Sequence, residues 1–136
     1  MAVTSPLLST GFVALGGAIG AAARYQLGRG MTAWLGPKVI TGFPWATLSA
    51  NVIGSLAMGL LAGWLARHGD TGSDHYRLLI GVGLLGGFTT FSAFSLELMV
   101  LIERGDSALA MGYALVSVLA GLSALYIGLI VMRLVG

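Results

Sequence analysis

The chain has 136 residues, of which 57% are hydrophobic and only 9% are charged. A soluble domain usually carries about 25% charged residues, so this composition argues against an ordinary water-exposed surface. The net charge of +2 comes from seven basic and five acidic residues, too few for the basic patch of a nucleic-acid-binding protein. The absence of cysteine excludes a disulfide framework and a cysteine–zinc site.

Uncharged stretches alternate with the few charged residues along the sequence, at 1–23, 39–66, 78–96 and 107–132. A helix needs roughly 20 apolar residues to cross a bilayer. We therefore predict an all-α integral membrane protein, a single domain over 1–136, with transmembrane helices near 8–33, 43–66, 77–103 and 107–134. The links between these helices are short, so any function must lie within the membrane.

Two ionisable side chains fall at membrane depth in this arrangement. Arg24 lies on the first helix after a long uncharged stretch, and Glu97 lies on the third after another. Charges inside a bilayer are expensive and usually functional. Their opposite signs predict a direct pair or a shared polar cluster. The alternative is that both side chains reach the membrane interface.

Polar residues recur every four positions on the second and fourth helices. Thr47, Asn51 and Ser55 share one face of the second helix. Tyr113, Ser117 and Gly121 have the same spacing on the fourth. Their hydroxyl and amide donors suit an anion moving along a narrow path. Hydrogen bonding between helices explains the same pattern equally well.

The third helix contains the most informative stretch, GGFTTFSAFS at 86–95. Two glycines followed by adjacent β-branched threonines weaken a helix in its middle, so we predict a break there. A break between Gly86 and Thr89 frees backbone carbonyls, which can bind a small cation. Phe91 and Phe94 share a face, and the electropositive edge of a phenyl ring can meet an anion. Two core phenylalanines would show the same spacing.

Basic residues do not select one orientation in the membrane. Arg67, Arg77 and Arg133 fall on the side of the two termini, and Arg29, Lys38 and Arg104 fall on the other, with Arg24 in addition if it reaches the interface. Without an excess on one side, insertion in both directions is expected, although a single orientation with weak bias remains an alternative. Dual insertion allows an antiparallel homodimer. Its close-contact faces would be small-residue pairs, namely Gly16/Gly20, Gly59/Gly63, Gly83/Gly87 and Ser117/Gly121.

Together these motifs resemble the Fluc (CrcB) family of fluoride channels over nearly the whole chain. The first helix carries GGAIGAAARY at 16–25, like the family's GGxxGAxxRY. The second carries TLSANVIG at 47–54, like GTLxxNxxG without its first glycine, which is Ala46 here. The third carries GGFTTFSAFSLE at 86–97, close to GGxTTFSTFSxE, with Ala93 in place of threonine. Tyr113 and Ser117 have the expected spacing on the fourth, whereas Gly121 replaces a further hydroxyl.

The resemblance implies an antiparallel, dual-topology homodimer with two pores in a bacterial inner membrane. It implies a fluoride-selective channel, not an enzyme, that exports fluoride passively and confers fluoride resistance. Asn51, Phe91, Phe94, Tyr113 and Ser117 would line the pore. Arg24, Thr47 and Glu97 would form a polar cluster beside it. The carbonyls of Gly86 and Thr89 would hold a structural sodium ion shared by the two subunits.

Three other functions compete with a channel. A small proton-coupled drug exporter needs an acid in its first helix, and this first helix has Arg24 instead. An enzyme is conceivable through a metal site made by His68, Asp70, Asp74 and His75, although polar side chains in an exposed loop are normally solvated. A structural subunit of another membrane protein is the third.

Overall fold

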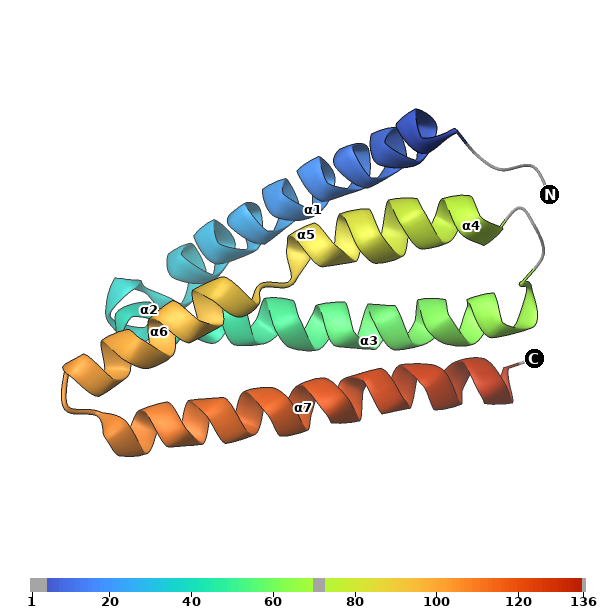
Figure 1. The fold of residues 1–136 in the computed structure, drawn as a ribbon. Coiled ribbons are helices and arrows are strands. Elements are labelled where there is room, and N and C mark those ends of the chain that lie inside the picture. The colour runs from blue at the N-terminus through green and yellow to red at the C-terminus, as the bar shows by residue number, and fades with distance from the viewer. Residues whose placement is uncertain (1–4, 70–72, 136) are drawn as a thin grey trace.

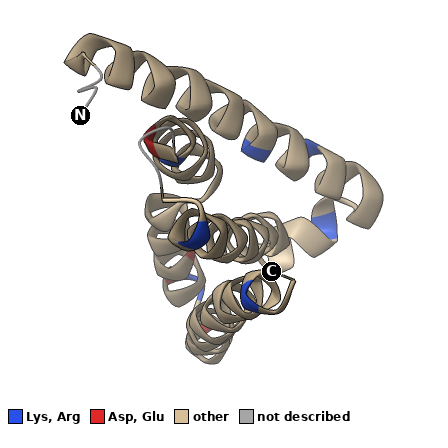
Figure 2. Cartoon of the chain, turned by 90° about the vertical axis from the view of Figure 1, so that its right-hand side faces the viewer, with Lys and Arg blue, Asp and Glu red and all other residues tan. Residues whose placement is uncertain are grey.

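Long helices that run side by side make up the computed structural model, which describes residues 5–69 and 73–135 (Figure 1). Four helical segments are long and apolar enough to cross a membrane, with mean hydropathies of 1.5, 1.5, 1.6 and 2.4 in chain order. Charged residues are sparse along these segments (Figure 2). Over the described residues, the prediction of an all-α protein with four helices of membrane-spanning length is therefore confirmed.

The first span, α1 (Pro6–Leu35), begins where the Ser5 hydroxyl accepts a hydrogen bond from the Leu8 amide. Pro6 suits the first helical position because its missing N–H would be unpaired there. Gly36, with φ of 85°, ends α1, and Pro37 starts the short helix α2 (Pro37–Gly42). The second span, α3 (Trp45–Arg67), follows. The α2 helix therefore occupies the link expected between the first two spans.

The third span consists of four elements rather than one regular helix. These are α4 (Ser73–Tyr76), the π-helix η1 (Arg77–Leu85), α5 (Gly86–Phe88) and α6 (Phe91–Glu103). The two residues between α5 and α6, Thr89 and Thr90, have extended backbone angles. After this step the ribbon continues as α6, which packs mainly against α7, whereas η1 and α5 pack against α1 (Figure 1). The glycines expected to lie in a break are helical, and the extended residues are the threonines that follow.

The last span, α7 (Ser107–Leu134), is joined to α6 by a tight turn. Gly105 has φ of 86°, and the Asp106 amide donates back to the Leu101 carbonyl over 2.9 Å. This pairing closes the end of α6 with a left-handed glycine. The turn places α7 beside α3, and α1 begins at the end of the bundle where α7 ends (Figure 1).

Glycines bring the helices into backbone contact at two places, between α1 and the third span and between α3 and α7. Gly16 and Gly20 of α1 face the backbone of η1 and α5, where Gly83 and Gly87 lie. Gly59 of α3 meets Gly128 and the Leu125 carbonyl of α7. Without Cβ atoms, helices approach closely enough for extensive van der Waals contact, which holds membrane helices together. Three of the four small-residue pairs expected at a dimer interface therefore pack within the chain.

A small apolar cluster fills the space between α3, α6 and α7. Its buried members are Leu48, Leu101, Ala110 and Tyr113, and Phe43, Val52, Phe94 and Leu98 pack against them. Tyr113 is fully buried. This cluster fixes the start of α7 against α3 and α6, and its aromatic part adjoins the polar residues described below.

We predict that Gly20→Ala destabilises the protein by about 1–3 kcal/mol, the usual cost of overpacking. A Cβ on Gly20 would collide with the Leu84 carbonyl and lie 2.9 Å from the Phe88 amide nitrogen, which are backbone atoms that cannot turn aside. Thermal unfolding of the purified variant in detergent measures this loss.

Gly17→Ala is the matched control on the same helix. Its new methyl would find only the Gly83 carbonyl, at 3.9 Å, and alanine is the better helix former by about 1 kcal/mol. Its midpoint should equal or exceed that of the unsubstituted protein. Equal midpoints for the two variants would contradict the packing described here.

Candidate functional site

Asn51 holds the backbone of the extended threonines with both ends of its side-chain amide. Its Oδ1 accepts a hydrogen bond from the Thr90 amide at 2.8 Å, and its Nδ2 donates to the Thr90 carbonyl at 3.2 Å. A backbone group unpaired in a membrane costs several kcal/mol, on the order of a lost hydrogen bond. Asn51 therefore satisfies the groups that an extended residue cannot pair within its own helix.

The threonine side chains complete this arrangement. The Thr90 hydroxyl caps α6 by accepting from the Ala93 amide at 3.2 Å. The Thr89 hydroxyl donates to the Leu85 carbonyl at 2.8 Å, and its methyl group lies against Gly54 of α3. The two threonine side chains thus pair backbone groups before and after the non-helical step, and Gly54, which has no side chain, leaves space for the Thr89 methyl group.

These bonds leave two carbonyls without their usual helical donors. In a continuous α-helix, the amide of residue 90 would donate to Gly86, and that of residue 93 to Thr89. Here the Thr90 amide donates to Asn51, and the Ala93 amide donates to Thr90 Oγ1. The two carbonyls, of Gly86 and Thr89, are those that the family resemblance implies as ligands of a cation.

A groove of about 340 Å³ lies beside the extended threonines, between α3, α6 and α7. We call it the phenylalanine groove. Four of the five predicted pore residues line it, namely Asn51, Phe91, Phe94 and Ser117. The rings of Phe91 and Phe94 have centroids 5.7 Å apart and are tilted by 43°. Phe91 is 80% exposed, so most of its ring contacts nothing within the chain.

The fifth predicted pore residue, Tyr113, does not line this groove. It is fully buried, with its ring centroid 5.1 Å from that of Phe94. Its hydroxyl donates to Glu97 Oε2 at 2.7 Å. The Thr47 hydroxyl donates to the other carboxylate oxygen, Oε1, at 2.6 Å. Glu97 is therefore held from two sides, by α3 and by α7, and Tyr113 links it to the phenylalanine groove.

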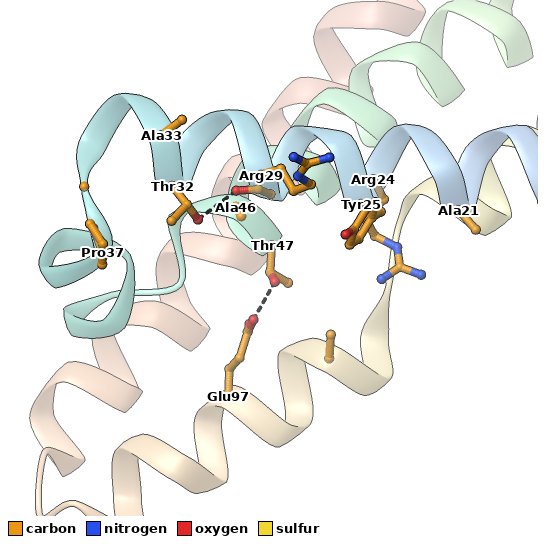
Figure 3. A pocket seen from close by; sticks show the side chains of 13 residues that line it. Ala21, Arg24, Tyr25, Arg29, Thr32, Ala33, Pro37, Ala46, Thr47 and Glu97 are labelled. Carbon is orange, nitrogen blue, oxygen red and sulfur yellow. Dashed lines mark hydrogen bonds between the residues drawn. The ribbon is translucent and has the colours of Figure 1, made fainter.

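A second groove, of about 1070 Å³, lies on the other side of Glu97 (Figure 3). We call it the arginine groove. It is lined by all three members of the predicted polar cluster, Arg24, Thr47 and Glu97, and also by Arg29. Arg24 donates through Nε to the Gly87 carbonyl at 3.3 Å. Among the described residues the ion pair found is Arg77 with Asp74, so Arg24 and Glu97 share a groove without forming a direct pair.

The contacts made by the basic residues near the helix ends could not be predicted from the sequence. The Arg29 guanidinium lies 5.9 Å from the ring centroid of Tyr25 on the same helix. Arg104 donates to the Thr41 carbonyl of α2 at 2.8 Å. A third groove of about 240 Å³ between α2 and α6 contains Arg104 and reaches Glu97 from that side. Because α2 was expected to be a link, nothing in the pattern predicted this groove.

The loop that suggested a metal site offers no cluster within the part of the chain that the structure describes. There, no group of three His, Cys, Asp or Glu side chains is placed to hold an ion. Asp70 lies outside the described residues. His68 stacks on Trp64, and His75 contacts Phe12 edge-on. Both imidazoles are thus engaged with aromatic rings.

Within the described residues, four membrane-length helices with polar side chains gathered in grooves between them are typical of a multi-pass membrane protein. Residues 11–129 match the family described as "CrcB-like protein, Camphor Resistance (CrcB)". The chain belongs to this family, as its motifs indicated.

Curated relatives agree with the family match. The chain is 56% identical to the "Fluoride-specific ion channel FluC" of Erythrobacter litoralis over 98% of both chains. It is 55% identical to the protein of the same name from Novosphingobium aromaticivorans, over 93% of this chain and 98% of the relative. It is 51% identical to that of Phenylobacterium zucineum, over 89% and 92%. These relatives are named as ion channels rather than as enzymes.

Proposed function

We propose that this protein is a fluoride-selective channel that lets fluoride leave the cytoplasm passively. The observation that carries the proposal is the gathering of Asn51, Phe91, Phe94 and Ser117 in one groove at membrane depth. Relatives that cover nearly the whole chain are named fluoride-specific channels. The same motifs that define the groove carry the family resemblance.

Fluoride is small and strongly hydrated, so a selective path must replace its water with donors. Asn51 Nδ2 has two N–H groups and uses one of them on Thr90, which leaves one for an anion. The Ser117 hydroxyl is buried and has no partner among the described residues. The edges of Phe91 and Phe94 add positive potential without the permanent charge that would trap the ion.

The arginine groove would collect the anion before it meets the phenylalanines. Arg24 and Arg29 line it, and positive charge in a groove with low-dielectric walls raises the local concentration of anions. Glu97 would otherwise repel fluoride. Hydrogen bonds from the Thr47 and Tyr113 hydroxyls partly compensate the negative charge of its carboxylate and orient the carboxylate toward these two residues.

Passive transport fits this site better than proton-coupled export. The α1 helix has no acidic residue that could exchange protons. The carboxylate predicted at membrane depth, Glu97, accepts hydrogen bonds from two hydroxyls. Passive efflux would protect a bacterium in which fluoride is trapped as its weak acid dissociates. The inner membrane is the location that this role requires.

We further propose an antiparallel, dual-topology homodimer with two pores. The balanced count of basic residues favours insertion in both directions. The exposed Phe91 ring, which lines the phenylalanine groove, would be covered by the second subunit. A structural sodium ion would lie on the two-fold axis, held by the Gly86 and Thr89 carbonyls.

The sodium proposal is supported by the chemistry of these carbonyls. Both have lost their helical donors to Asn51 and Thr90, and hard cations prefer neutral or anionic oxygen ligands. One chain offers two such oxygens, so a pair of subunits would offer four. The positive charge of the ion would interact favourably with the carbonyl oxygens of both subunits and so join the subunits.

Fluoride efflux from liposomes that contain only this protein tests the proposed function. We expect fluoride to leave much faster than chloride, with no ATP and no proton gradient. Phe94→Leu keeps apolar bulk but removes the ring edge, so fluoride efflux should fall roughly two- to twelvefold, in keeping with an aromatic interaction of about 0.5–1.5 kcal/mol.

Phe12→Leu is the control for this variant, because Phe12 lies on α1 against His75 and outside both grooves. It should transport fluoride normally. Equal fluoride and chloride efflux from the unsubstituted protein would disprove selectivity, and would also remove the reason for assigning the phenylalanine groove to fluoride.

Single cysteines test dual insertion against a background that has none. Val135→Cys places a thiol just after the end of α7, and Glu103→Cys places one at the other end of the bundle, where α6 turns into α7. Both positions are exposed. In intact cells, a membrane-impermeant maleimide should label about half of the copies of each variant. Complete labelling of one variant and no labelling of the other would show a single orientation.

A further inference from the structure

We propose that Ser55 donates a hydrogen bond to the permeating anion at a second position in the phenylalanine groove, in the space that Gly121 leaves open. This inference rests on the proposed fluoride function and adds a specific residue to it. Ser55 lies one helical turn beyond Asn51 on α3, and both residues line the groove. The path would then continue along α3 and α7 beyond the phenylalanines.

The first observation is that two hydroxyls in this groove have no partner. In a helix, serine and threonine hydroxyls commonly donate to the carbonyl four residues earlier, as Thr32, Thr89 and Ser95 do here. Within the described residues Ser55 makes no such bond. Ser117 Oγ, on the facing helix α7, is also buried without one.

The second observation is the open space beside Ser55. Gly121 lies one turn beyond Ser117 on α7 and lines the same groove. A Cβ built on Gly121 would lie 3.5 Å from Ser55 Oγ. The Ser55 hydroxyl therefore faces the position where any other residue at 121 would begin its side chain. Glycine at this position keeps the space free for a small ligand.

These observations point to an anion rather than to a structural hydrogen bond. A hydroxyl without a partner costs free energy in an apolar environment, so two of them in one groove indicate a ligand or water that accepts hydrogen bonds. The groove is also lined by the apolar side chains of Met58, Val118 and Leu125, and by Thr89 and Thr90. The two threonine hydroxyls already bond to the Leu85 carbonyl and the Ala93 amide. The apolar side chains provide no acceptor to compete for the hydroxyls, and no charged residue among those described lines the groove to hold an anion permanently.

The experiment is fluoride efflux from liposomes for Ser55→Ala and for Ser55→Ala combined with Gly121→Ser. Loss of a hydrogen bond to a charged group should lower efflux about tenfold in Ser55→Ala. The double variant returns a hydroxyl to the same space from α7, so efflux should recover toward that of the unsubstituted protein. Ser123→Ala, at an exposed position of α7 outside the groove, is the control and should transport normally.

Efflux from Ser55→Ala within twofold of the unsubstituted protein would overturn the proposal, as would a double variant no better than Ser55→Ala. If Ser55→Ala does not fold, Gly121→Ala decides instead. Its methyl group makes only ordinary contact with Ser55 Oγ yet occupies the proposed site, so reduced efflux supports the proposal and normal efflux overturns it. Absence of fluoride efflux from the unsubstituted protein would refute the proposed function itself, which is a separate outcome.

Discussion

The pair of hydrogen bonds between the Asn51 side chain and the Thr90 backbone is the interaction on which the rest of the site depends. Two extended residues within a membrane-spanning segment leave backbone groups without helical partners, and lipid cannot supply them. Asn51 supplies both a donor and an acceptor to one residue. The direction of α6 follows from this local geometry, and α6 carries Phe91, Phe94 and Glu97 into the grooves.

Close glycine packing provides the rigid frame around this interaction. The α1 helix lies directly on η1 and α5, and α3 lies directly on α7, through glycines that admit backbone contact. The Arg24 guanidinium then reaches across from α1 to the Gly87 carbonyl. Gly87, shortly before the extended threonines, packs against α1, and the threonines themselves lie against Asn51 and Gly54 of α3.

Much of this arrangement could be predicted from the sequence, because membrane thickness and the cost of buried charge act on composition directly. The four spans and the polar face of Thr47, Asn51 and Ser55 were visible as uncharged stretches and a four-residue spacing. The roles within that face were not, because Thr47 turns to Glu97 while Asn51 turns to Thr90. Spacing identifies a face of a helix but not the partner of each side chain.

Other features depended on tertiary contacts that local pattern does not contain. Gly86 and Gly87 have low helix propensity, yet they are helical because Gly87 packs closely against Gly17. The extended residues are Thr89 and Thr90, and Asn51 forms hydrogen bonds with the backbone of Thr90. The glycine pairs on α1 and α3 were expected at an interface between subunits, whereas they pack within one chain. Small residues mark close contact between helices without specifying which helices.

Amide hydrogen exchange at Thr90, resolved by NMR in detergent or nanodiscs, tests most directly whether Asn51 holds the extended threonines. Asn51→Leu keeps the side-chain size and removes both hydrogen bonds, so the Thr90 amide should exchange roughly five- to 150-fold faster, as expected for the loss of a buried bond worth about 1–3 kcal/mol. Asn51→Asp retains an acceptor for that amide and should keep most of its protection. The Leu48 amide, which donates to the Pro44 carbonyl, should exchange at the same rate in all three proteins. A Thr90 amide equally protected in Asn51→Leu and in the unsubstituted protein would contradict the account.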